Sequence, residues 1–348
     1  MVSIINLLYI LIALLVFGLL IFIHELGHFL CARACGVGIK EFAIGMGPKL
    51  FSWNSKKYST VYCVRLLPIG GYVSMVGEDE ESDQPNSFNN QKLWKRISIV
   101  LAGPVMNILL GFLLMFALVI SQKTLLGTTI RTFDSAALSS EVLCVDDKII
   151  KVGSTRVYTF NDIVYEVMHN GNKPIDVTVI RDGEETVVED VNFPIYVEKG
   201  VEFGKYDFLP YAEKETPSNY LKHALARSVS TVKMVLDSVV DLAKGRYGVE
   251  AISGPVGVTE VIVEAAQKSV YSLMSIVIVI SINLGVFNLI PFPALDGGRL
   301  AFLVIEGITR KPIKKEVEGY VNFVGIIILL AFMAFIIVKD VFMIVGGI

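Results

Sequence analysis

The sequence contains little of what builds several common classes of protein. It has four cysteines and four histidines among 348 residues, and its formal net charge is −3. Scattered cysteines in a chain of this length do not indicate a disulfide framework. The lack of excess positive charge argues against nucleic acid as a main partner. Hydrophobic residues make up 53% of the chain and the mean hydropathy is +0.60, which is typical of membrane proteins.

Charged side chains are absent from four long stretches of the chain. A helix needs about 20 apolar residues to cross a bilayer. Each stretch supplies that length: residues 1–23, 97–122, 270–295 and 319–338. The first stretch has no basic leading segment and no small-residue cleavage site, which predicts a membrane helix and not a signal peptide. The expected fold is a polytopic α-helical membrane protein with four transmembrane helices.

The distribution of lysine and arginine predicts the orientation of these helices. Basic residues occur in two segments next to the apolar stretches, 31–96 and 299–315, and none precedes the first helix. The stretch 123–269 also holds basic residues, but it is long, so its own charge says little about orientation. Because basic loops stay on the cytoplasmic side of a membrane, both segments should be cytoplasmic and both termini extracytoplasmic. The stretch 123–269 should then lie outside the cytoplasm.

The regions between the apolar stretches differ in pattern. Residues 37–76 alternate around glycines, which predicts a β element. Residues 123–200 show a strand, a helix and a hairpin turning at 181–183, which fits a small peptide-binding α/β domain. Residues 217–245 carry apolar side chains at helical spacing, with Thr216 as the expected cap. This amphipathic helix belongs either to the soluble domain or to the membrane surface, and the sequence favours neither.

The first apolar stretch ends in His24-Glu25-Leu26-Gly27-His28, an H-E-x-x-H pattern. On a helix, residues i and i+4 share a face, so both imidazoles can bind one Zn²⁺. Glu25 can then reach a water molecule at the metal and act as general base, as in metalloproteases with this motif. Ionisable groups in a membrane helix carry a free-energy cost and are functional by default. Chance or purely structural histidines therefore explain the segment less well than a metal site.

A catalytic zinc site usually has three protein ligands. The remaining histidines, His169 and His223, fall in the extracytoplasmic stretch, so the third ligand should be a carboxylate. Asp296 is the first acid after the third apolar stretch and lies at the cytoplasmic end, at the depth of the motif histidines. Pro291 and Pro293 prevent regular helix before it, and the following glycines permit a turn. The alternative interpretation of Asp296 is a turn residue at the end of a helix.

The HELGH motif and the segment "NLIPFPALDGG", residues 288–298, together resemble the site-2 protease family of intramembrane zinc metalloproteases. More narrowly, the chain is similar to the bacterial regulator of sigma-E protease group in its single-PDZ form. The resemblance covers essentially the whole chain. It implies a transmembrane helix at 1–30, a cytoplasmic or re-entrant β loop at 31–95, a second helix at 96–122, a PDZ-like domain at 123–200, an amphipathic helical region at 201–268, a third helix at 269–295, a turn and basic loop at 296–318, and a fourth helix at 319–345.

The resemblance also implies the reaction. An intramembrane zinc endopeptidase of the bacterial inner membrane would hydrolyse peptide bonds within transmembrane segments of single-span proteins already trimmed on their outer side. Anti-sigma factors and remnant signal peptides both suit this role. His24, His28 and Asp296 would bind zinc, and Glu25 would be the base and proton carrier.

Residues that match the family's substrate-handling segments come from three places. The resemblance places Asn288, Pro291 and Pro293 beside the site, Asn107 in the segment "AGPVMN", and Gly45, Gly47, Gly70 and Gly71 in the re-entrant β element. An edge strand in that element would hold an extended substrate by β-augmentation. For Asn107 and Asn288, hydrogen bonding between helices is an equally good interpretation.

The PDZ-like domain departs from the family in one turn. The family has Pro-Gly-Asp where this chain has Cys144-Val145-Asp146-Asp147. The domain would therefore act mainly as a size filter that excludes untrimmed substrates, in place of binding a carboxyl terminus.

Two other classes of function are weaker hypotheses. A metal transporter would spread its polar residues over several helices and show internal repeats, and the membrane histidines occur here in one motif. A non-catalytic scaffold that uses the PDZ-like domain would not need Glu25 beside the two histidines. The sequence therefore favours an enzyme.

Overall fold

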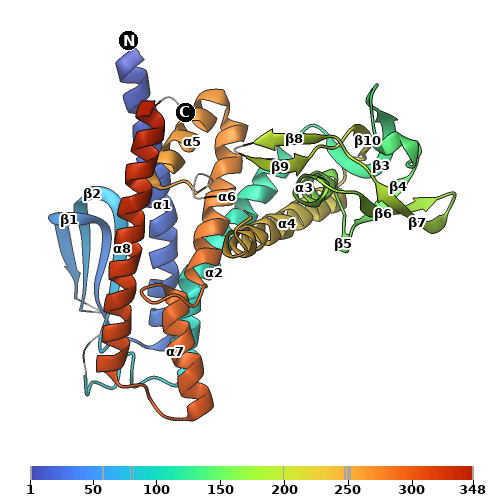
Figure 1. Cartoon of the computed structure of the whole chain (residues 1–348). Helices are drawn as coiled ribbons and strands as arrows, with labels where there is room; N and C mark the ends of the chain where they lie inside the picture. Colours follow the sequence, from blue (N-terminus) through green and yellow to red (C-terminus); the bar gives the residue numbers. More distant parts are fainter. Residues whose placement is uncertain are drawn as a thin grey trace. The chain divides into compact units, whose positions relative to one another are not determined.

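The computed structural model describes residues 2–56, 59–78, 80, 82–198, 200–246, 248 and 252–346 (Figure 1). The chain forms two compact units. The first combines Met1–Gly111 with Ser253–Ile348, and the second is Phe112–Ile252.

Four helices are long and apolar enough to cross a membrane, as predicted. They are α1 (Val2–Cys35), α2 (Leu93–Ile120), α6 (Val270–Asn288) and α8 (Lys315–Gly346). Two shorter helices adjoin α6 in the sequence: α5 (Pro255–Lys268) precedes it and α7 (Asp296–Thr309) follows it. The helix α7 corrects the prediction of a turn and a loop in this segment.

The predicted β element is confirmed as β1 (Ile39–Ser55) and β2 (Thr60–Met75). Both strands bend, so four short segments lie side by side in the order 49–55, 60–65, 39–46 and 71–75. The bends contain Gly45, Gly47 and Gly70, whose φ angles of 83°, 85° and 87° favour glycine. Residues 71–75 pair with 39–44 on one side, and among the described strands nothing pairs with their other side. They form an edge strand of the first unit.

A buried core joins this β element to the helices around it. It takes aromatic and aliphatic side chains from α1, β1, β2, α2, α7 and the loop between β2 and α2: Phe29, Phe42, Met75, Phe88, Ile99 and Leu303 are among them. Burial of large apolar side chains stabilises such a core by about 1.5–3 kcal/mol for each. The core therefore fixes the end of α1 that carries HELGH against the edge strand.

The second unit contains a six-stranded sheet. Its strands run in the order β10 (Phe208–Glu213), β3 (Leu125–Phe133), β4 (Lys148–Val152), β6 (Ile175–Arg181) and β7 (Glu184–Val191), with β5 (Thr155–Arg156) paired to β4. The helix α3 (Phe160–Asn170) packs on the sheet, and a 3₁₀ turn (Ser139–Glu141) follows β3. A separate pair, β8 (Ile195–Glu198) and β9 (Val201–Gly204), precedes β10.

The predicted strand, helix and hairpin of the second unit are confirmed. Asp182 and Gly183 have φ angles of 53° and 87°, which suit the tight turn between β6 and β7. The sheet nevertheless extends past the predicted boundary at residue 200, because β10 pairs with β3. Pro210 lies inside β10 and argues against a strand in the sequence, but β10 is an edge strand, where proline is tolerated.

The turn that departs from the family pattern is closed by an aspartate. The buried Asp147 carboxylate accepts a hydrogen bond from the Cys144 backbone N–H at 2.8 Å and pairs with Arg181 at 2.7 Å. Asp146 takes the left-handed conformation, with a φ of 70°. The segment therefore forms a tight turn without the glycine of the family pattern.

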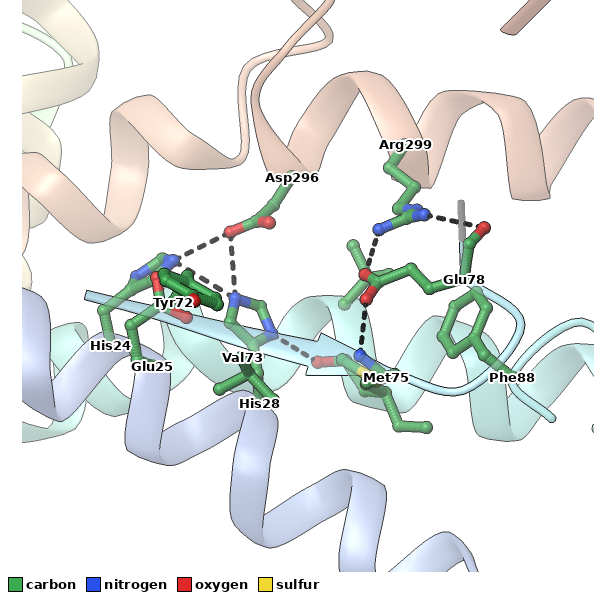
Figure 2. A pocket seen from close by; sticks show the side chains of 12 residues that line it. His24, Glu25, His28, Tyr72, Val73, Met75, Glu78, Phe88, Asp296 and Arg299 are labelled. Atoms are coloured by element: carbon green, nitrogen blue, oxygen red, sulfur yellow. Dashed lines mark hydrogen bonds and ion pairs between the residues drawn. The ribbon is translucent and has the colours of Figure 1, made fainter. Parts of the chain in front are cut away.

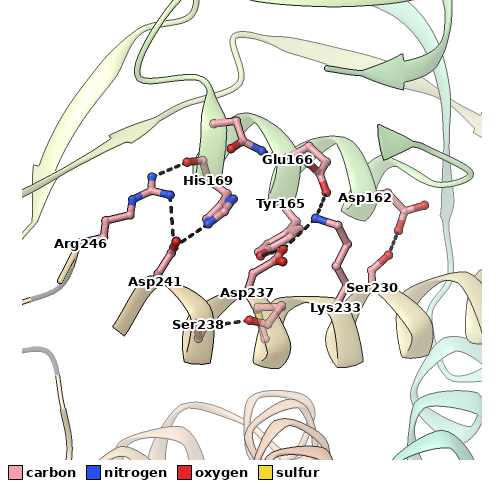
Figure 3. Close-up of polar contacts among 12 residues, drawn as sticks. Asp162, Tyr165, Glu166, His169, Ser230, Lys233, Asp237, Ser238, Asp241 and Arg246 are labelled. Atoms are coloured by element: carbon pink, nitrogen blue, oxygen red, sulfur yellow. Dashed lines mark hydrogen bonds and ion pairs between the residues drawn. The ribbon is translucent and has the colours of Figure 1, made fainter. Parts of the chain in front are cut away.

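The amphipathic helix is α4 (Pro217–Ala243), and Thr216 caps it as predicted by accepting a hydrogen bond from the Asn219 N–H. Its charged side faces α3: Lys233 pairs with Glu166 at 2.8 Å and Asp241 with His169 at 2.7 Å (Figure 3). Its apolar residues remain 46–60% exposed: Leu221, Leu225, Val229, Leu236 and Val240. Of the two interpretations of this helix, the exposed apolar side favours the membrane surface.

Candidate active site

The HELGH segment lies on α1, as predicted. His24 and His28 are one helical turn apart and are 7% and 8% exposed, so both rings are held inside the first unit. Gly27 lies between them and makes room for α2, because a Cβ at this position would lie 2.4 Å from the Ala102 carbonyl oxygen. The two rings therefore face a neighbouring helix and not lipid.

Asp296 reaches the same place from the start of α7. The helix α6 ends at Asn288, and residues 289–295 are not helical, as Pro291 and Pro293 predict. The chain then folds back so closely that a Cβ on Gly297 would lie 2.1 Å from the Ile290 carbonyl oxygen. Gly297 and the following glycine do not form the predicted turn. They let the first turn of α7 pack against the preceding loop, which directs the Asp296 carboxylate inward.

Three potential metal-ligand atoms converge at this point (Figure 2). The Asp296 Oδ2 atom lies 3.0 Å from His24 Nε2 and 3.4 Å from His28 Nε2, and the two Nε2 atoms are 3.2 Å apart. Tetrahedral zinc with nitrogen and oxygen ligands at about 2.0–2.2 Å places neighbouring ligand atoms about 3.3 Å apart. The three measured distances match the edges of such a tetrahedron, so the residues fit zinc.

The ligands line a cavity of about 220 Å³ that also contains Glu25. The edge strand forms one wall through Tyr72, Val73 and Met75. Gly71 keeps the strand close to Glu25, because a Cβ at position 71 would lie 3.5 Å from the Glu25 Cγ atom. The unpaired side of the strand therefore adjoins the carboxylate that would act as base.

An ion pair forms another wall of the cavity. Arg299, one turn after Asp296 on α7, pairs with Glu78, whose carboxylate also accepts a hydrogen bond from the Met75 N–H at 3.1 Å (Figure 2). The Arg299 guanidinium lies over the Phe88 ring, 5.2 Å from its centroid, which is within the limit of about 6 Å for a cation–π contact. This pair joins the end of the edge strand to the helix that carries Asp296.

The helix α2 supports the two histidines from behind. His28 Nδ1 lies 2.8 Å from the Ile99 carbonyl oxygen and donates to it, which leaves Nε2 free to bind a metal. Gly103 lies against the same ring, since a Cβ there would be 2.3 Å from His28 Nε2. Asn107, fully buried, lies beside His24.

The model of peptidase family M50 matches residues 12–332, a range that includes HELGH and Asp296. The chain belongs to peptidase family M50. This is the site-2 protease family, so the resemblance seen in the sequence is confirmed.

Several relatives in the M50 family match over nearly their full length. A Clostridium acetobutylicum protein described as a candidate zinc metalloprotease is 35% identical over 332 residues, which cover 95% of this chain and 97% of the relative. The regulator of sigma-W protease RasP of Bacillus subtilis is 29% identical over 413 residues, covering 94% and 96%. The zinc metalloprotease RasP of Geobacillus kaustophilus is 29% identical over 410 residues, with the same coverage. The chain is therefore a zinc metalloprotease of the M50 family.

None of the predicted substrate-binding residues is among those that line the described cavity, although Gly71 precedes Tyr72, which does. Gly71 begins the edge strand, whereas Gly45 and Gly47 lie at the bend of β1 and Gly70 at the bend of β2. The residues Asn288, Pro291 and Pro293 belong to the connection between α6 and α7 and do not line the described cavity. Asn107 does not line it either, and its position beside His24 favours a contact between helices.

The Glu78–Arg299 pair and the contact of Gly103 with His28 are two features of the site that the sequence does not predict. The two members of the ion pair are 221 residues apart, so no spacing pattern links them. Nothing in the local sequence around Gly103 indicates that the His28 ring occupies the space beside it.

Proposed function

We propose that this M50 protease is an intramembrane endopeptidase in which His24, His28 and Asp296 hold the zinc ion and Glu25 is the general base. The observation that carries this proposal is the convergence of His24 Nε2, His28 Nε2 and Asp296 Oδ2 within 3.0–3.4 Å of one another. Glu25 and the free side of a β-strand lie at the same cavity. Metal, base and a surface for the substrate backbone are the parts that peptide hydrolysis requires.

The reaction is hydrolysis of an amide bond. Zinc bound to the three ligands supplies a Lewis acid that polarises the carbonyl and lowers the pKa of water to about 7. Glu25 accepts a proton from the attacking water molecule while the oxygen of that water forms a bond to the carbonyl carbon. The same carboxylic acid then gives the proton to the amide nitrogen as the C–N bond breaks. Glu25 is thereby restored to its starting state.

The substrate class is a transmembrane segment that has been unwound locally. Peptide bonds in a helix are shielded by the helix itself, so the segment must extend before it can enter the cavity. Residues 71–75 offer an unpaired strand side next to Glu25, and an extended peptide can add to it through main-chain hydrogen bonds. Asn288, Pro291 and Pro293 would meet the substrate at the connection between α6 and α7.

The proposed orientation places both basic loops in the cytoplasm and the second unit outside it. The M50 chain would then act in the bacterial inner membrane on single-span proteins whose outer part has already been removed. Anti-sigma factors and remnant signal peptides are the proposed substrates. The second unit, with its PDZ-like fold, would exclude substrates that retain a folded outer domain.

A pair of matched substrates tests the substrate class. Both contain one identical apolar span, but one ends in a short outer stub and the other in a folded outer domain. We expect the purified full-length enzyme in proteoliposomes to cleave the first within the span and to leave the second intact, with cleavage sites mapped by mass spectrometry. Cleavage outside the span would refute intramembrane hydrolysis, and equal cleavage of both substrates would refute the requirement for trimming.

Asp296→Asn tests the ligand set. Asparagine keeps an oxygen donor but loses the negative charge that offsets the metal, so zinc affinity should fall at least as far as it does on loss of a contact that supports a ligand, which costs about 10- to 100-fold. Competition with a chelator measures this affinity. Asp134→Asn, in the second unit and remote in sequence from the three ligands, is the matched control. Wild-type zinc affinity in Asp296→Asn would remove Asp296 from the ligand set.

A further inference from the structure

Asn107 is buried completely, and its side-chain amide has one polar contact among the residues that the structure describes. The Nδ2 atom lies 3.3 Å from His24 Nδ1, and Oδ1 has no hydrogen-bond partner among the described residues. The Ser281 hydroxyl donates to the backbone oxygen of Asn107 at 2.7 Å and leaves the side-chain amide unaffected. The amide therefore faces the ring of a zinc ligand and not the substrate cavity.

Zinc binding decides which hydrogen-bonding role the amide must have. His24 presents Nε2 to Asp296 and His28, so this nitrogen needs its lone pair for the metal. A neutral imidazole then carries its proton on Nδ1. If an Asn107 N–H pointed at that nitrogen, two hydrogen-bond donors, the amide N–H and the Nδ1–H, would face each other. The two ends of an amide differ only by a rotation and are assigned from their partners, and here the partner requires the oxygen.

The other histidine provides an internal comparison. His28 Nδ1 donates to the Ile99 carbonyl oxygen at 2.8 Å. Ile99 and Asn107 are eight residues apart on α2, about two helical turns, and His24 and His28 are one turn apart on α1. The close approach of the two helices at Gly27 and Gly103 makes both contacts possible. One face of α2 thus places an acceptor behind each ring.

We propose that Asn107 is a positioning residue whose side-chain carbonyl accepts the Nδ1–H of His24 and fixes the tautomer that leaves Nε2 free for zinc. The inference rests on the ligand set proposed above. It assigns to Asn107 a role that substrate binding does not require, and it separates the acceptor function of the amide from its donor function.

Two variants distinguish these functions. Asn107→Asp keeps an acceptor and has no N–H, whereas Asn107→Leu has a similar size and neither group. We expect Asn107→Leu to weaken zinc binding by about 10- to 100-fold, as loss of a ligand's hydrogen-bond partner does in other zinc sites. Asn107→Asp should bind zinc at least as tightly as wild type, because its charge also offsets the metal. Chelator competition on the purified full-length protein measures both affinities.

Three controls show whether a change in the zinc affinity of the Asn107 variants comes from the amide itself. Ser281→Ala removes a buried hydrogen bond to the same residue without touching the amide, and it should leave zinc affinity unchanged. Thermal unfolding of the zinc-free proteins reports whether each variant folds. His24→Ala should abolish tight binding, and failure of that result, or a wild type that binds no zinc, would contradict the ligand set itself.

The proposal is overturned if Asn107→Asp binds zinc as weakly as Asn107→Leu, because the amide would then act as a donor or through packing. It is equally overturned if both variants bind zinc like wild type. The melting temperature gives an independent measure, since at a fixed concentration a ligand that binds only the folded state stabilises it more when it binds more tightly. Zinc should raise the melting temperature of Asn107→Asp more than that of Asn107→Leu.

Discussion

Replacing Glu25 with glutamine should leave zinc bound and slow peptide hydrolysis by about 10²- to 10⁴-fold, the usual contribution of a general base. Glutamine has nearly the same size and polarity, but it cannot accept the proton of the attacking water. Glu25 is not one of the three converging ligands, so the metal should remain. Cleavage of the trimmed single-span substrate gives the rate, and elemental analysis gives the zinc content.

The matched control for this result is Glu260→Gln. Glu260 is an exposed residue of α5 in the first unit and does not line the cavity, so its loss should change neither rate nor zinc content. A Glu25→Gln enzyme that cleaves at the wild-type rate would exclude Glu25 as the base. A variant that loses zinc together with activity would instead assign Glu25 to the support of the metal.

The convergence of HELGH with Asp296 could be predicted from the sequence because several constraints act on few residues. Helical spacing places His24 and His28 on one face, and only two other histidines exist in the chain. A third ligand from the same side of the membrane therefore had to be a carboxylate. The structure brings the three side chains together, and their roles are what the zinc measurements test.

Features that depend on distant packing could not be predicted in this way. Two glycines after a proline-rich segment indicate a turn locally, yet they begin α7 because the preceding loop packs against them. The Glu78–Arg299 pair and the strand β10 likewise depend on segments that meet only in the folded protein. Local sequence patterns carry no information about such partners.

A second large effect on zinc affinity is expected at the contact between α2 and His28. Gly103→Ala adds a Cβ whose ideal position lies 2.3 Å from His28 Nε2 and 2.7 Å from Cε1. The ring cannot move aside without losing the hydrogen bond from its Nδ1 to the Ile99 carbonyl oxygen. We expect zinc affinity to fall by more than about 100-fold, beyond the loss of a supporting contact. Overpacking should also lower the free energy of unfolding by about 1–3 kcal/mol.

Gly319→Ala is the matched control, because this α8 glycine has open space around its Cβ position. Alanine is the better helix former, so that variant should gain up to about 1 kcal/mol and keep its zinc. Zinc content after dialysis and thermal unfolding in detergent measure both variants. Alanine favours helix at position 103 as well. A lower zinc affinity or a lower stability of Gly103→Ala can therefore come only from the clash of the added Cβ with the His28 ring. Wild-type zinc affinity in Gly103→Ala would show that α2 does not hold this ring in the active enzyme.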